Sequence, residues 1–276
     1  MNKLFLIKRI AFVMSAIMCF AALCGCARSH DDDDDDQDLP EFVIGSDYYE
    51  PFIYKNDDGE LAGLDVKIAT EVCKQLRLKP KFVHIDWEKK NDYLSSGEID
   101  CIWGCFSITG REDVYSWSLP YMNTRQVVAV SENSNIFAIS DLQGKRVAVQ
   151  TTTKPDEIFS RQMKDRLAIP ELNSLNTFPD MSYVFAAIAD GYVDAIAGHE
   201  EALLEYMKTS SLKLRILEEP LLEAQIGVAF LKGTHADVIE RINKAFRLLK
   251  NNGFCAELFS SYGLDPQNRV VNYEKT

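Results

Sequence analysis

The sequence lacks the short motifs that mark common catalytic and metal centres. Its 276 residues contain no phosphate-binding loop, no HExxH helix and no nucleophile elbow. There is also no CxxC pair, which argues against a zinc site. Positive charge is scarce, because 30 Lys and Arg stand against 42 Asp and Glu, for a net charge of -12. Nucleic-acid binding needs a basic face, so we expect no nucleic-acid partner. Because the catalytic and metal motifs are missing, we also expect no cofactor, no metal and no catalytic residue.

A hydrophobic run long enough to span a membrane is missing as well. The apolar stretch Ile10–Leu23 is shorter than the roughly 20 residues of a spanning helix. It follows three basic residues within the first nine, as the core of a signal peptide does. It ends in Leu23-Cys24-Gly25-Cys26, which resembles the bacterial lipobox. We therefore predict a signal peptide over 1–25 and lipidation of Cys26; secretion without lipid and a retained anchor helix are the alternatives.

The segment after Cys26 has almost no apolar surface to bury. Ala27–Asp38 contains no large apolar residue, and Asp31–Asp36 is an unbroken acidic run that repels itself. We expect an extended linker over 26–39 that holds a folded body away from the membrane. Loose calcium binding by the six aspartates is the alternative.

Cysteine is sparse in the folded part. Four cysteines remain after Cys26: Cys73, Cys101, Cys105 and Cys255. An exported protein can form disulfides, but Cys101 and Cys105 are roughly 13 Å apart at strand rise, too far for a bridge. We expect free, mostly buried thiols.

From Glu41 onward, strand and helix patterns alternate, which is typical of a mainly parallel sheet covered by helices. The helical stretch 63–78 is amphipathic, with apolar residues at Leu64, Ile68, Val72 and Leu76. A second helix over 91–96 ends at Gly97, the usual left-handed stop. The strands that we predict in this half are Glu41–Ser46, Lys81–Ile85 and Ile99–Trp103.

The second half repeats this order. We predict strands at Val147–Gln150, Leu175–Phe178 and Val193–Ala197, and helices at Pro155–Leu167 and Ser182–Ala189. The halves also match locally. Leu94–Ile102 aligns with Ile188–Ile196: each has a helix end, a glycine, a β-branched residue, an aspartate, a small residue and an isoleucine. The match suggests two lobes of one architecture.

The C-terminal part is expected to close the first lobe with a strand at Ile226–Phe230 and a helix at Ala236–Asn251 stopped at Gly253. We expect crossings between lobes near 127–131 and 225–229, and two adjacent crossing strands form a hinge. The predicted fold class is α/β, with two Rossmann-like lobes joined by a two-strand hinge. Lobe 1 comprises 40–129 and 227–276, and lobe 2 comprises 130–226. A ligand would bind between them at the carboxyl ends of the strands.

Several segments, in this order and spacing, resemble the type II periplasmic-type solute-binding proteins of amino-acid ABC transporters (extracellular solute-binding proteins, family 3). The resemblance covers about 41–263. The segments are Gly45-Ser46-Asp47 with Tyr49-Glu50-Pro51-Phe52, Gly63-Leu64-Asp65-Val66, Ser107-Ile108-Thr109-Gly110-Arg111, Ser118-Leu119-Pro120-Tyr121, Asp141-Leu142-Gln143-Gly144-Lys145, and Val147-Ala148-Val149-Gln150.

The resemblance implies a group for the carboxylate of an amino-acid ligand. Arg111 matches the family's arginine, whose planar fork binds that carboxylate; a surface arginine paired with an adjacent acid is the alternative. Ser107 would add a hydroxyl and Cys105 a backbone group. Thr152 and Thr153 fall where the family places a Gly-Thr pair at a helix N-terminus, although a plain N-cap would use the same residue types.

Aromatic side chains would pack against the rest of the ligand. Tyr49 and Trp87 match the family's stacking positions, and burial in the core is the alternative. The loop from Asp47 to Pro51 is one residue shorter than the family's. Asp47 is a predicted ligand residue, but the alignment with the family does not fix its position.

The chain departs from the family at His199. The family usually has an aspartate there, which binds the ligand ammonium. A neutral imidazole is a poor partner for an ammonium, and an imidazolium would repel it. Either Glu200 or Glu201 replaces the aspartate, or the solute lacks a standard α-amine or brings a second acid to His199, or His199 is simply a satisfied loop histidine.

The resemblance implies a monomeric, non-enzymatic, lipid-anchored protein on the extracytoplasmic side of the membrane, which delivers a small amino-acid-like solute with a carboxylate to ABC transporter permeases. Two alternatives remain. One is a ligand-sensing module for a separate membrane receptor. The other is a cyclohexadienyl-dehydratase-like enzyme, which needs a general acid in the cleft such as His199, Glu200 or Glu223.

Overall fold

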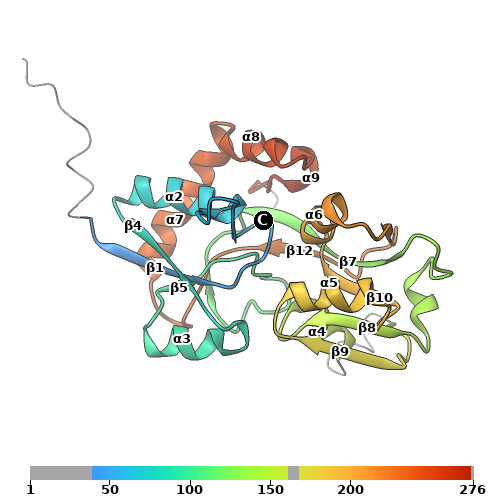
Figure 1. Ribbon diagram of the computed structural model, residues 1–276. Helices are drawn as coiled ribbons and strands as arrows, with labels where there is room; N and C mark the ends of the chain where they lie inside the picture. The colour runs from blue at the N-terminus through green and yellow to red at the C-terminus, as the bar shows by residue number, and fades with distance from the viewer. Residues whose placement is uncertain (1–38, 161–167, 275–276) are drawn as a thin grey trace, which may run out of the picture. The chain divides into compact units, whose positions relative to one another are not determined.

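The computed structural model describes residues 39–160 and 168–274 (Figure 1). The described residues from Pro40 onward form one compact unit. The predicted signal peptide, Cys26 and the acidic run lie outside the described residues. Within the described residues, no helix combines the length and apolarity needed to cross a membrane.

The first sheet has the strand order β4-β1-β5-β13-β6. β1 pairs in parallel with both β4 and β5, whereas β13, from the C-terminal part, is antiparallel to β5 and β6. A small hairpin of β2 and β3 follows β1. The bounds are β1 Glu41–Ser46, β2 Tyr54–Lys55, β3 Leu61–Ala62, β4 Lys79–His84, β5 Cys101–Ile102, β6 Ser116–Trp117 and β13 Ala229–Phe230.

Amphipathic helices pack against this sheet and against each other. α2 buries Leu64, Ile68, Val72 and Leu76, the stripe that the sequence predicts, and packs against α7 and β4. α3 ends at Gly97, whose φ of 77° is the left-handed conformation that favours glycine. The bounds are α2 Leu64–Leu76, η1 Trp87–Lys89, α3 Lys90–Ser96, α7 Ala236–Asn251, α8 Phe254–Ser261 and α9 Pro266–Arg269.

The second sheet has the order β11-β7-β10-β8-β9, and β12 also pairs with β7. β8 is parallel to β9 and β10, and β7 is antiparallel to β10, β11 and β12. α4, α5 and α6 pack on these strands. The bounds are β7 Met122–Ser131, η2 Ile139–Leu142, β8 Arg146–Gln150, α4 Lys154–Phe159, β9 Ser174–Phe178, α5 Met181–Ala189, β10 Ala195–His199, α6 Glu200–Thr209, β11 Leu214–Ile216 and β12 Leu222–Ile226.

The passage between the two sheets differs from the expectation at one point. Residues 127–131, expected at the first crossing, pair with β10 and β11 inside the second sheet. The start of β7 lies beside the return segment, where Met122 is opposite Ile226. The strand expected over 226–230 is divided into β12 and β13. Between them, the amides of Gly227 and Val228 donate to Phe106 and Ser118 of the first lobe.

Other boundaries shift for local reasons. The strand expected at 193–197 is β10, two residues later, and Asp194, just before it, binds Arg146 at the start of β8. α4 ends at Phe159 among the described residues, and 161–167 of the helix predicted over 155–167 lies outside them.

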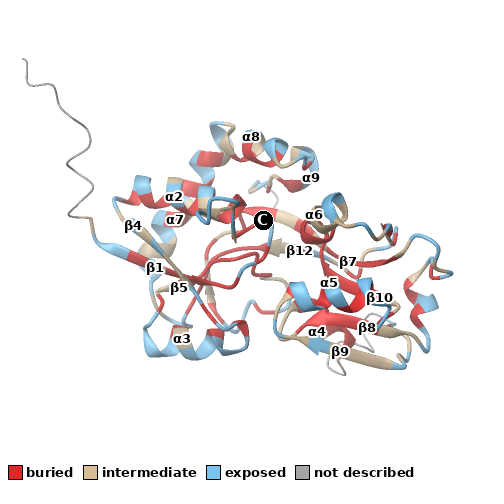
Figure 2. Ribbon diagram, viewed as in Figure 1, coloured by how far each residue is buried: buried red, intermediate tan, exposed pale blue. Residues whose placement is uncertain are grey.

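The core follows the strands of both sheets (Figure 2). One cluster of buried side chains contains residues of both lobes, among them Ile44, Trp103, Ala148 and Ile196. A second lies under the second sheet and includes Val149 and Ile158. Cys73, Cys101, Cys105 and Cys255 are free and buried, which confirms the prediction for the thiols.

Candidate ligand-binding site

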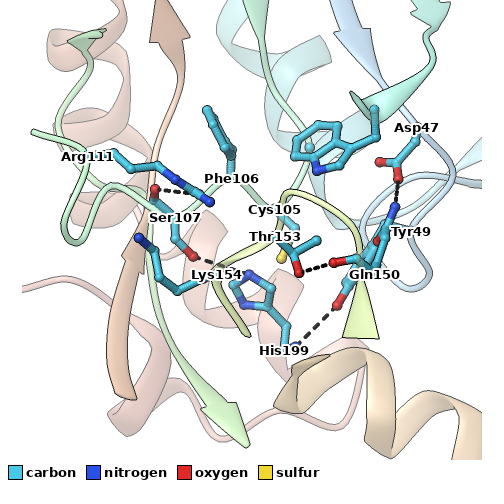
Figure 3. A pocket seen from close by; sticks show the side chains of 12 residues that line it. Asp47, Tyr49, Cys105, Phe106, Ser107, Arg111, Gln150, Thr153, Lys154 and His199 are labelled. Atoms are coloured by element: carbon cyan, nitrogen blue, oxygen red, sulfur yellow. Dashed lines mark hydrogen bonds between the residues drawn. The ribbon is translucent and has the colours of Figure 1, made fainter. Parts of the chain in front are cut away.

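A cavity lies where residues of the two lobes meet (Figure 3). Its volume is about 20 Å³, room for one water molecule. An amino-acid-sized solute therefore fits only when the lobes separate. The lining residues are Asp47, Tyr49, Trp87, Gly104, Cys105, Phe106, Ser107 and Arg111 from the first lobe, and Gln150, Thr153, Lys154 and His199 from the second.

Arg111 enters this cavity from the loop that follows β5. It is only 7% exposed, and its guanidinium carbon lies 4.8 Å from the centroid of the Phe106 ring. Its Nε donates to Glu157 Oε1 at 2.7 Å, and its Nη2 also pairs with Glu157, which belongs to α4 of the other lobe. The structure thus differs from the alternative of a surface arginine paired with its neighbours, because the guanidinium is buried and holds a carboxylate across the cleft.

Lys154 reaches the same place from the second lobe. Its side chain is 1% exposed, and its ammonium also pairs with Glu157. Burial and the Arg111 charge lower the pKa of Lys154, although Glu157 opposes this shift. Arg111, Lys154 and Glu157 form a group that we call the cleft cluster. It contains two cations and one carboxylate.

His199, at the end of β10, joins a network of neutral groups. Its Nε2 lies 2.8 Å from Gln126 Nε2 and 3.3 Å from Ser107 Oγ, and its Nδ1 lies 3.2 Å from Thr124 Oγ1. Burial, followed by the charges of Arg111 and Arg269, lowers the pKa of His199 to about 3. The imidazole is therefore neutral near pH 7, and Nε2 accepts from the Gln126 amide.

Asp47 and Tyr49, from the loop after β1, contact the second lobe. Asp47 Oδ2 accepts from Gln150 Nε2 at 2.6 Å, and the Tyr49 hydroxyl accepts from the backbone N–H of His199 at 3.2 Å. Burial raises the pKa of Asp47 to about 6, while its hydrogen bonds oppose the shift. Asp47 is thus mostly ionised at neutral pH and lies on the cavity wall.

The backbone of Cys105 is fixed by a buried acid. Asp65, at the start of α2, accepts from the Cys105 N–H at 2.7 Å, so this N–H is not free to bind a ligand. Burial raises the pKa of Asp65 to about 7. Cys105 has a φ of 50°, a left-handed conformation that is unfavourable for residues other than glycine. This strained turn brings Cys105, Phe106 and Ser107 to the cavity.

Trp87 lines the cavity, and Lys90 packs against its ring from outside the lining. Trp87 is 6% exposed and stacks edge to face with Phe106 at 5.3 Å. Its buried indole Nε1 has no hydrogen-bond partner among the described residues. The Lys90 ammonium lies 4.8 Å from the centre of the Trp87 ring and donates to Thr152 Oγ1 at 2.7 Å. Burial lowers the pKa of Lys90 to about 8.

The threonines before α4 play different parts. Thr153 is the N-cap residue and lines the cavity, but its hydroxyl donates to the Gln150 carbonyl at 2.6 Å rather than capping the helix. Thr152 is outside the lining. It has a φ of 57°, its N–H donates to Asp156, and its carbonyl accepts from Arg111 at 3.4 Å.

Glu200 and Glu201 lie away from the cavity. Glu200 pairs with Arg125 and Arg269, and Glu201 lies 3.0 Å from Arg269 Nε and accepts from Thr124. We call Arg125, Arg269, Glu200 and Glu201 the α6 cluster. Although burial raises the pKa of Glu200, the pairs with Arg125 and Arg269 lower it overall. Neither Glu200 nor the unprotonated His199 is therefore a suitable general acid for the dehydratase alternative.

The cavity brings together eight of the ten predicted ligand residues: Asp47, Tyr49, Trp87, Cys105, Ser107, Arg111, Thr153 and His199. Thr152 lies just behind it, and Glu200 belongs to the α6 cluster. Sequence reasoning missed Gly104, Phe106, Gln150 and Lys154. Gly104 and Phe106 flank the predicted residue Cys105, and Gln150 ends a predicted strand, so the sequence could have indicated all three as cavity residues. Nothing in the sequence around Lys154, next to Pro155 at a helix start, indicated that it would line the cavity.

The profile of the bacterial extracellular solute-binding proteins, family 3, matches residues 42–265. The chain belongs to this family. It is 28% identical over 266 residues to the L-cystine-binding protein TcyA of Bacillus subtilis (strain 168), covering 91% of this chain and 96% of the relative. It is also 29% identical over 238 residues to the histidine-binding periplasmic protein of Escherichia coli (strain K12), covering 81% and 88%.

Solved structures of solute-binding proteins have the same fold. An ancestral arginine-binding protein bound to arginine matches with a TM-score of 0.72 at 26% identity, covering 80% of this chain and 97% of that one. A histidine-bound substrate-binding protein of an ABC uptake transporter from Streptococcus pneumoniae matches with a TM-score of 0.75 at 23% identity, covering 82% and 93%. The fold is thus the two-lobed α/β fold of type II periplasmic binding proteins, as the sequence predicts.

Proposed function

We propose that this chain is the substrate-binding lipoprotein of an ABC importer, which captures a small amino-acid-like solute with a carboxylate between its lobes. The observation that carries the proposal is the cavity itself, where Arg111 of one lobe already holds a carboxylate of the other. The relatives are amino-acid-binding proteins, which supports the same class of solute.

The solute would bind with its carboxylate on Arg111, whose fork suits two parallel hydrogen bonds. Arg111 donates to the backbone carbonyl of Ser107 at 3.4 Å. The Ser107 hydroxyl and the Arg111 guanidinium would therefore both bind the same end of the solute. Trp87, Tyr49 and Phe106 supply apolar surface for the rest of the solute.

Binding would be coupled to closure of the lobes. A solute held by Arg111 on one side and by Thr153 and Lys154 on the other binds the closed form better and shifts the population toward it. The Glu157 carboxylate bridges the same cations, so an incoming carboxylate would compete with it or share them. Permease subunits would then recognise the closed form.

We further propose that lipid on Cys26 anchors the protein on the extracytoplasmic side of the membrane. The support is the Leu23-Cys24-Gly25-Cys26 sequence after a short apolar run. Metabolic labelling with a fatty acid should mark the wild-type protein and leave Cys26→Ala unlabelled. Equal labelling of both would contradict the anchor.

The solute-binding role is tested by thermal unfolding of the purified protein with single amino acids and dicarboxylates. A solute that binds only the native state raises the unfolding free energy by about 2.7 kcal/mol at a hundred times its Kd. A clear shift with one such solute is expected. Absence of any shift across the series would contradict the proposed function.

A further inference from the structure

The charges around the cavity do not balance. Its lining contains two cations, Arg111 and Lys154, and one carboxylate, Asp47. Outside the lining lie Lys90 and the partly exposed carboxylates of Glu157 and Asp156, whose charges water screens in part, so the excess of +1 belongs to the lining itself. Glu88 and Glu112 also act on the two lysines, but both are exposed, so water screens them.

Neither His199 nor the α6 cluster supplies the missing negative charge, and Asp156 and Asp180, which act on Lys90 and Asp47, lie outside the lining and are partly exposed. His199 is a neutral acceptor within its network of Gln126, Ser107 and Thr124. Glu200 and Glu201 are held by Arg125 and Arg269 in the α6 cluster, where two carboxylates meet two cations. Burying an uncompensated charge is costly, so a solute that neutralises the excess would be favoured over one that does not.

Two residues of the cavity lining each carry a buried polar atom that has no hydrogen-bond partner among the described residues. Trp87 Nε1 is a donor, which suits a carboxylate oxygen. Gln150 Oε1 is an acceptor, and its amide nitrogen is already engaged by Asp47. An ammonium on the solute would therefore meet the Gln150 oxygen and the ionised Asp47.

From these observations we propose that the cleft selects a solute of net charge -1, of the acidic amino-acid class with two carboxylates and one ammonium, and that Lys154 is the residue that sets this preference. The inference rests on the proposed function. One carboxylate binds Arg111 and the other binds Lys154, whose side chain is almost fully buried beside it (Figure 3). The ammonium is held by Gln150 and Asp47, and His199 serves as a neutral hydrogen-bond partner.

The test compares near-isosteric pairs by calorimetric titration of the full-length protein. L-glutamate is paired with L-glutamine and L-aspartate with L-asparagine; L-cystine, L-histidine and L-arginine are also titrated. The acidic member of at least one pair should bind on the order of tenfold more tightly than its amide, and more tightly than the other three. Tightest binding by a neutral or cationic solute would overturn the inference and leave the proposed function standing. Absence of binding by every solute would overturn both.

Two variants with opposite effects separate charge from damage to the fold. Lys154→Met brings the cleft sum to zero, so the acid-to-amide affinity ratio should fall toward one. Glu157→Gln removes a negative charge from beside Arg111 and Lys154, so the ratio should increase. Lys244→Met removes a lysine whose side chain is 71% exposed on α7, and should leave the ratio unchanged. A ratio that moves in the same direction in the first two variants would overturn the role of Lys154.

Discussion

The cleft cluster and the α6 cluster are built from the same kinds of group, yet they differ in charge balance. The cleft cluster has two cations that share one carboxylate, Glu157. The α6 cluster has two cations and two carboxylates, and the side chains of Glu201 and Glu200 are 0% and 9% exposed, although that of Arg125 is 34% exposed. A set in which every buried carboxylate has its own cation stabilises the fold, whereas a set with an excess cation can bind a carboxylate of a ligand.

The largest effect on the free energy of unfolding should come from disrupting the α6 cluster. Arg269→Met leaves Glu201 buried without its cation and removes one of the two partners of Glu200. Loss of one partner from a buried pair costs about 3–5 kcal/mol, so the free energy of unfolding should fall by that amount in urea denaturation. Arg146→Met, at an arginine whose side chain is 39% exposed, is the matched control. A loss no greater than the control's would mean that the α6 cluster does not stabilise the fold.

Removal of the cleft arginine should affect binding more than stability. Arg111→Met removes the charged fork from the carboxylate site, and loss of a buried, charged hydrogen-bonding partner costs about 2–3 kcal/mol of binding, roughly a hundredfold in Kd. Calorimetric titration with the solute found by thermal unfolding measures this. Lys244→Met should bind like the wild type. Unchanged affinity in Arg111→Met would remove Arg111 from the binding site.

The sequence predicted the elements whose pattern is local. β1 and α7 have the bounds expected, because a short buried strand and an amphipathic stripe are both determined by a few neighbouring residues. Arg111 and Ser107 could be placed because an ordered set of motifs surrounds them. The role of Glu200 could not be predicted, since it depends on Arg269, 69 residues later along the chain. Lys154 was missed for a related reason: a lysine at a helix start is usually solvated, and only the packing of the opposite lobe buries it.

His199 connects the two clusters and should give wild-type stability a pH dependence. Thr124 contacts both His199 Nδ1 and Glu201, and the ring lies near the charges of Arg111 and Arg269. The pKa of His199 is lowered from 6.5 to about 3, so the unfolded chain binds the extra proton between these values. The stability that this residue contributes is complete above pH 6.5 and is lost as the pH falls toward 3.

Between pH 7 and pH 5, the ligand-free wild type should therefore lose about 2 kcal/mol more unfolding free energy than His199→Gln, whose amide does not titrate. Urea denaturation at the two pH values measures the difference. Other groups with a shifted pKa, such as Asp47, are present in both proteins, so their contributions to the pH dependence cancel in the comparison. Parallel loss in the two proteins would mean that His199 can be protonated freely in the folded state.

The smallest effect should come from an ion pair that belongs to neither cluster. Arg146 pairs with Asp194 at 2.7 Å, but the two side chains are 39% and 32% exposed, so water competes for both charges. Exposed pairs contribute at most about 1 kcal/mol, and the Arg146 backbone N–H keeps its bond to Asp194 when the side chain changes. Arg146→Gln should thus lower the unfolding free energy by less than about 1 kcal/mol and leave solute affinity unchanged. A loss as large as that of Arg269→Met would show that enclosure does not separate structural from incidental ion pairs in this fold.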